Sequence, residues 1–163
     1  MTAVWDTTVA SRLRPAGGEI DHVRARHEAG NPVGVAAPTV LEIVYGWQRK
    51  AARDARFEKE LTWFTDLVGA GTVSVLPFGK TAAVVSGRVR AVHPHPPAGQ
   101  DDRRSKTMRQ AAWLMDIQIA ATAFAAGRDV ATQNGRDFER LREILAELYP
   151  DAPPLEVVAS PFD

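Results

Sequence analysis

Acidic residues placed in or beside apolar stretches are the chemically informative feature of this chain. Asp6 ends an apolar run at the N-terminus, Glu42 lies inside the apolar segment 38–44, and Asp116 lies in the middle of the segment 111–124. Burying an ionised carboxylate without a partner costs several kcal/mol or forces its protonation. One divalent cation held by all three acids would remove that cost at three places, which points to a metal-dependent enzyme.

Each acid also has an explanation that involves no metal. Asp6 precedes Thr-Thr-Val and fits a helix N-cap. Glu42 has apolar neighbours that predict a helix buried nearly all round, but it also fits a less buried stripe near Gln48 or Arg49. Asp116 fits a buried acid that accepts a hydrogen bond from a backbone donor. Without a metal, all three separate explanations must be true at once. One shared role in binding a cation is the simpler interpretation, and we favour it.

The composition is that of an ordinary globular protein. Of 163 residues, 45% are hydrophobic and 25% charged, and 20 basic residues balance 20 acidic ones. We therefore expect one domain over residues 1–163 with a core of its own. The balanced charge gives no evidence for nucleic acid, although local patches still matter. The absence of cysteine excludes disulfides, thiolate catalysis and cysteine-based zinc sites.

Targeting signals are not evident. No stretch approaches the roughly 18 consecutive apolar residues of a membrane span. The N-terminus shows no basic region followed by a long apolar stretch. We expect a cytoplasmic protein that does not engage a membrane.

Short apolar runs alternate with helical patterns along the chain. Strands are expected at 3–5, 33–37, 72–76, 128–132 and 155–158. Helices are expected at 7–13, 19–29, from 38 onward, 55–68, 81–92, around Asp116 up to Gly127, and 137–148. Strands separated by helices predict an α/β fold, with a mostly parallel central sheet of about five strands and helices on both faces. The proline-rich, charged stretch 93–107 is expected to be an inserted loop.

Polar side chains follow several of these strands. Asp6 follows the first strand, Glu42 lies one turn into the helix after the second, and Asn134 and Asp137 follow the fourth. Ligands bind beyond the carboxyl ends of parallel strands. The order of elements thus brings these polar groups to one edge, although Asp137 also suits a helix N-terminus and Asn134 a turn.

A basic cluster precedes the Asp116 helix and consists of Arg103, Arg104, Lys106 and Arg109. Such clusters are usually solvated, and the functional interpretation here is a flap that contacts RNA phosphates. The four histidines do not have the spacing of a zinc site. Glycine-rich phosphate loops, dinucleotide fingerprints and nucleophile elbows are absent from the sequence.

Four blocks of sequence, at 5–11, 39–46, 116–123 and 131–138, resemble those of PIN-domain ribonucleases. The resemblance is greatest to VapC-type toxins of bacterial type II toxin–antitoxin systems, in the branch that includes FitB. It implies a PIN-like fold and an endoribonuclease, dependent on Mg²⁺ or Mn²⁺, that leaves a 5′-phosphate and a 3′-hydroxyl.

The resemblance also implies roles for single residues. Asp6, Asp116 and Glu42 map to the metal-binding acids. Many relatives carry an acid where this chain has Asn134, and Asp137 follows one turn later, so Asp137 is assigned a supporting catalytic role. Thr8, Thr132 and Asn134 would hold the acids in place.

Partners follow from the same resemblance. They are a VapB-type antitoxin, an RNA substrate (tRNA or rRNA) and a second copy of the chain in a homodimer. The antitoxin groove is expected on the helices of 40–68, with Trp47 and Trp63, unless these tryptophans belong to the core.

Two alternatives stay open. One is a non-catalytic PIN-like module that binds RNA or protein, and another is a nuclease acting on DNA or on a structured substrate. A haloacid-dehalogenase-type phosphatase is disfavoured because Thr8 stands where its second Asp is needed.

Overall fold

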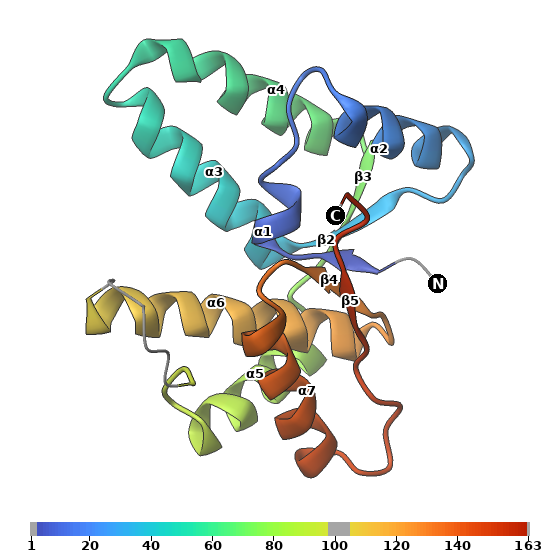
Figure 1. Cartoon of the computed structure of the whole chain (residues 1–163), viewed down its shortest axis with the longest axis vertical. Helices are drawn as coiled ribbons and strands as arrows, with labels where there is room; N and C mark the ends of the chain where they lie inside the picture. The colour runs from blue at the N-terminus through green and yellow to red at the C-terminus, as the bar shows by residue number, and fades with distance from the viewer. Residues whose placement is uncertain (1–2, 98–104, 163) are drawn as a thin grey trace.

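A five-stranded parallel sheet divides the molecule into two layers of helices (Figure 1). The computed structural model describes residues 3–97 and 105–162. Arg103 and Arg104, two of the predicted RNA-contacting residues, lie outside the described residues. Within those ranges, no helix combines the length and the apolar character that crossing a membrane requires.

The strands are short and mostly buried. Their bounds are β1 (Val4–Trp5), β2 (Val33–Ala36), β3 (Val73–Leu76), β4 (Val130–Thr132) and β5 (Val157–Ala159). Their order in the sheet is β3-β2-β1-β4-β5, and every neighbouring pair is parallel. The three central strands are buried at every position, as expected for a sheet covered by helices on both faces.

The helices fall into two groups, one on each side of the sheet (Figure 1). The first group is α1 (Thr7–Ala10), α2 (Gly18–Glu28), α3 (Ala37–Ala51) and α4 (Glu58–Gly69), with a 3₁₀ turn at Ala55–Phe57. The second group is α5 (Lys80–Val92), α6 (Lys106–Ala125) and α7 (Gly135–Leu148). The chain therefore fills one face first and the other face afterwards.

Alternation along the strands builds two separate cores. Val4 packs with α5, α6 and α7, whereas its neighbour Trp5 packs with α1 to α4. On β2, Ala36 packs in the same core as Val4, and Val35 packs in the same core as Trp5. Successive strand residues point to opposite faces, so continuous apolar runs are what a strand covered on both sides requires.

The strand order creates one special position, between β1 and β4. Connections run outward from β1 through β2 to β3 on one side, and from β4 to β5 on the other. Val4 pairs with Val130 and Trp5 with Ala131, and the Asp6 amide donates to the Ala131 carbonyl at 3.1 Å. The two loops that leave β1 and β4 diverge at this topological switch point, where α/β sheets bind ligands.

The predicted fold is confirmed, and the element boundaries differ in places. The first helix was expected over 7–13 but ends at Ala10. The amides of Arg12 and Leu13 donate to carbonyls three residues back, so the chain continues in a tighter 3₁₀-like turn. Pro15 follows and cannot continue a helix. The prediction that the Glu42 helix is buried nearly all round was wrong. Leu41 and Tyr45 of α3 are 61% and 59% exposed, because only one face of that helix contacts the sheet.

Two valines on α5 provide a test of this layered core. Val89 is 1% exposed and Val84 is 62% exposed on the same helix. We expect Val89→Ala to lower the free energy of unfolding by about 2 kcal/mol, since it removes two buried carbon groups and leaves a cavity. Val84→Ala should stay within about 0.5 kcal/mol of the wild type. Urea unfolding of both variants measures the difference, and equal losses would contradict the assignment of this face of α5 to the core.

Candidate active site

Asp6 is the buried centre of the candidate site. The residue is only 1% exposed to solvent. One carboxylate oxygen, Oδ1, accepts from the Val9 amide at 3.0 Å and from the Thr8 hydroxyl at 2.7 Å. The other, Oδ2, accepts from the Thr132 hydroxyl at 2.6 Å. Asp6 is therefore the N-cap of α1 and at the same time joins the loop after β1 to the end of β4.

Burial raises the pKa of Asp6 above its ordinary value of 3.8, because removal from water penalises the charged form. The hydrogen bonds from Thr132, Thr8 and the Val9 amide act against this rise by stabilising the carboxylate. A buried acid with a perturbed pKa at the switch point of an α/β sheet is a candidate for a functional residue.

Two threonine hydroxyls connect Asp6 to the loop between β4 and α7. The Thr132 hydroxyl accepts from the Asn134 amide at 2.8 Å while it donates to Asp6. The Thr8 hydroxyl accepts from the Gln133 amide at 2.9 Å. Each threonine hydroxyl thus donates its hydrogen to the Asp6 carboxylate and accepts a backbone amide of the β4–α7 loop on its oxygen.

Asn134 bridges two further acids. Its side-chain nitrogen Nδ2 lies 3.3 Å from Oδ2 of Asp116, on α6, and 3.0 Å from Oδ2 of Asp137, in the first turn of α7. Asp137 is buried, and the Arg136 guanidinium lies 3.4 Å from its other oxygen. Asn134 therefore keeps two carboxylates near each other by donating to both.

Glu42 approaches from the opposite helical layer. It lies in the second turn of α3, is half-buried, and accepts a short hydrogen bond from the Thr7 hydroxyl at the start of α1. Thr7 was not singled out in the sequence, because a threonine next to a helix N-cap is common. Arg136 was missed for a similar reason, since its pairing with Asp137 depends on the turn into α7.

The acids form a chain of hydrogen-bonded groups around the switch point. Asp6 connects to Asn134 through Thr132, and Asn134 connects to Asp116 and Asp137. Among residues 3–97 and 105–162, however, no three acidic or histidine side chains lie close enough to hold one metal ion. The oxygen donors suit a hard divalent cation, but the side chains would have to turn toward one another to share it.

The remaining predicted RNA contacts lie on α6. Lys106 is exposed at the first residue of the helix, and Arg109 is partly buried one turn later. Asp116 follows Arg109 by about two turns of the same helix. The helix thus extends from the basic end of the predicted flap to the acidic site.

Comparisons with solved structures bear on the fold of the chain. No protein-family model matches the sequence, and no curated protein matches it. A chain of VapBC2 from Rickettsia felis, bound to a DNA fragment from its promoter, is similar over 98% of both chains, with a TM-score of 0.58 and 16% identity. DNA-bound VapBC from Salmonella typhimurium is similar over 98% of both chains, with a TM-score of 0.56 and 21% identity.

FitAB bound to an IR36 DNA fragment is similar over 98% of this chain and 95% of that chain, with a TM-score of 0.51 and 20% identity. The fold is that of a PIN-like domain. The VapC- and FitB-like fold predicted from the four sequence blocks is confirmed. Identities this low establish the fold alone, so the roles of the acidic residues rest on the geometry of this PIN-like domain.

The hydroxyl of Thr132 offers a first test of the site. We expect Thr132→Val to lower the free energy of unfolding by about 1–3 kcal/mol, because the Asn134 amide loses its acceptor and Asp6 loses a donor. Valine keeps the shape and suits a strand. Thr62→Val, at an exposed position of α4, should change stability by less than about 0.5 kcal/mol. Chemical unfolding compares the two, and equal effects would show that the Thr132 bonds contribute nothing.

The raised pKa of Asp6 predicts a pH dependence. Between pH 3.8 and the higher pKa of the folded state, the folded protein holds the Asp6 proton more tightly than the unfolded chain. The free energy of unfolding therefore falls as pH rises through this window. The side chain that replaces Asp6 in Asp6→Asn does not titrate, so the free energy of unfolding of this variant should lack this part of the fall with pH. Urea unfolding in EDTA at a series of pH values gives the difference between the proteins, and parallel curves would contradict the pKa shift.

Proposed function

We propose that this PIN-like domain is a metal-dependent endoribonuclease of the toxin type, neutralised by a VapB-type antitoxin. One observation carries the proposal: four acids from four separate elements, Asp6, Glu42, Asp116 and Asp137, come to the carboxyl edge of the sheet around its switch point. A fold needs no such concentration of carboxylates for stability, since burying them is costly. The similarity of the fold to VapBC and FitAB structures supports the same class of function.

The cation we propose is Mg²⁺ or Mn²⁺, held by Asp6, Asp116 and Glu42. Carboxylate oxygens are the ligands that these hard ions prefer. When bound, the ion would lower the pKa of a coordinated water and neutralise phosphate charge. Binding to the folded protein alone should raise its melting temperature with ion concentration.

The other residues of the site have positioning roles in this proposal. Thr8 and Thr132 fix the orientation of Asp6, and Thr7 fixes that of Glu42. Asn134 limits the separation of Asp116 and Asp137 and reduces their repulsion while no cation is present. Such supporting contacts hold reactive groups in a productive geometry.

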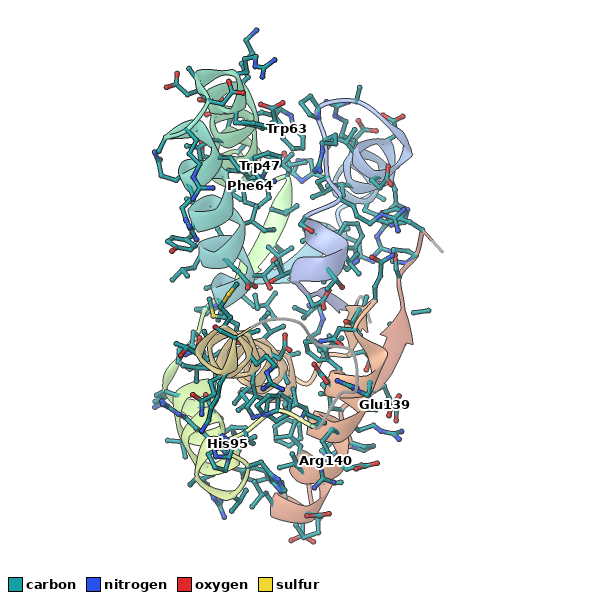
Figure 2. The ribbon with its side chains drawn as sticks, turned by 60° about the vertical axis from the view of Figure 1, so that its left-hand side comes forward. Trp47, Trp63, Phe64, His95, Glu139 and Arg140 are labelled. Atoms are coloured by element: carbon teal, nitrogen blue, oxygen red, sulfur yellow. The ribbon has the colours of Figure 1, made fainter. Side chains whose placement is uncertain are left out.

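The proposed partners are an antitoxin, a tRNA or rRNA substrate, and a second copy of the chain, and we propose that they meet in the cytoplasm. Trp47 and Trp63, which were expected to line the antitoxin groove, are half-buried and pack against the core. Figure 2 shows both in the part of the molecule that holds α2, α3 and α4, near Phe64. The exposed apolar residues of α3 are instead Leu41 and Tyr45, and these are better placed to contact a protein partner.

Cleavage of tRNA and rRNA fragments tests the proposed activity. We expect the wild type to cut in Mg²⁺ or Mn²⁺ and to stop in EDTA. Asp116→Asn should reduce the rate on the order of a hundredfold or more, as for the loss of one group that stabilises developing charge. Asp66→Asn, at an exposed position of α4, should cut like the wild type.

Two results would count against this function. Cleavage that persists in Asp116→Asn at the wild-type rate would show a contaminating nuclease or a different site. RNA binding by a folded wild type, without cleavage under any of these conditions, would favour the non-catalytic PIN-like module.

A further inference from the structure

A pocket of about 270 Å³ lies beside the acidic site, between α3 and the segment that begins with α1. Thr7 and Glu42 line one end of it, and Arg14 and Lys50 line the other. Glu42 and Lys50 are eight residues apart on α3, or about 12 Å along the helix axis. The pocket therefore joins a carboxylate of the proposed active site to two cations.

The two cations are held on one aromatic side chain. The Arg14 guanidinium carbon lies 5.3 Å from the centroid of the Trp47 ring, and the Lys50 ammonium lies 4.4 Å from it. These are cation–π distances. Trp47 itself is held by packing against the core and by a ring contact with Phe57 at 6.0 Å. The indole is thus a rigid support that keeps both charges at the pocket.

Backbone contacts restrict Arg14 further. Its Nη1 donates to the carbonyls of Ser11 and Leu13 at 2.7 and 2.6 Å. Within residues 3–97 and 105–162, neither Arg14 nor Lys50 forms a salt bridge with a carboxylate. Two positioned cations without an anionic partner, in a pocket that opens next to an acidic centre, are arranged to bind an anion.

A glycine lines the pocket where open space continues along α3. Gly46 lies on α3 midway between Glu42 and Lys50, and a Cβ atom added there would meet nothing within 4 Å. A glycine inside a helix costs roughly 1 kcal/mol relative to alanine. Space at this position lets a ligand pass along α3 from the acidic end to the basic end.

We propose that this pocket binds a backbone phosphate of the RNA strand beyond the bond that is cut, through Arg14 and Lys50. The inference rests on the proposed ribonuclease function and adds a substrate contact to it. A phosphodiester chain fits a pocket with an acidic and a basic end. One phosphate would lie near the proposed Mg²⁺ or Mn²⁺ at the acidic end, and a second would contact Arg14 and Lys50 at the basic end. It also explains how a chain with balanced net charge gains local affinity for RNA.

Salt-dependent binding of a short single-stranded RNA oligonucleotide tests the proposal. All proteins carry Asp116→Asn, so that the RNA stays intact. Each phosphate contact contributes about 0.7 to the slope of log K against log salt concentration. Arg14→Gln combined with Lys50→Gln should lower the slope by about 1.4 and weaken binding on the order of 20-fold at 0.1 M salt.

Three matched variants separate charge from structure. Arg49→Gln removes a cation of α3 that lies over Tyr45, away from the pocket, and should leave the slope unchanged. Lys50→Arg keeps the charge and should keep the slope. Gly46→Leu should weaken RNA binding by filling the pocket, without lowering the melting temperature.

Suppose that the parent binds RNA and the wild type cleaves it, but the double glutamine variant keeps the parent's salt slope. That result would overturn the assignment of the pocket as a phosphate site and leave the ribonuclease function intact. If the same variant instead lost its complex with the antitoxin, the pocket would belong to the protein partner, and the RNA assignment would be wrong. A parent protein that binds no RNA, together with a folded wild type that does not cleave it, would overturn both the pocket assignment and the proposed function.

Discussion

The Asp6 carboxylate, buried between the ends of β1 and β4, is the interaction on which the site depends. Its oxygens accept from a backbone amide and from two threonine hydroxyls, and each of those hydroxyls accepts from the loop that enters α7. A charge in this position is unfavourable unless donors surround it. The two threonine hydroxyls among these donors also hold the β4–α7 loop, and with it Asn134, in place.

The topology explains why this happens between β1 and β4. Crossover connections send the chain to one face of the sheet after β1 and to the other after β4, which leaves a gap between diverging loops. Asp6 and Thr132 border the gap from the strands. Asp116 and Asp137 come from the layer of α5 to α7, and Glu42 comes from the other layer. The site is therefore shared by both halves of the fold, and neither core alone could build it.

Neutral hydrogen-bond donors hold the acids of the candidate site. Asn134 donates to two of them, Thr7 to a third, and Thr8 and Thr132 to Asp6. These neutral donors stabilise negative charge without neutralising it, so the carboxylates keep an attraction for positive ligands. The cations held on Trp47 lie at the far end of the neighbouring pocket, where they extend the same electrostatic pattern along α3.

The class of fold and the set of acids could be predicted from the amino-acid sequence. Periodicity and turn residues located nearly every element, because continuous apolar runs and helical spacing are local signals. Asp6, Glu42 and Asp116 were recognisable because an acid in an apolar stretch is conspicuous. The hydrogen-bond partners of these acids, in contrast, follow from how the elements pack. The Thr7–Glu42 and Asn134–Asp116 contacts join residues far apart in the chain, and the exposed face of α3 depends on which side meets the sheet. Such pairings arise from packing, which no local pattern encodes.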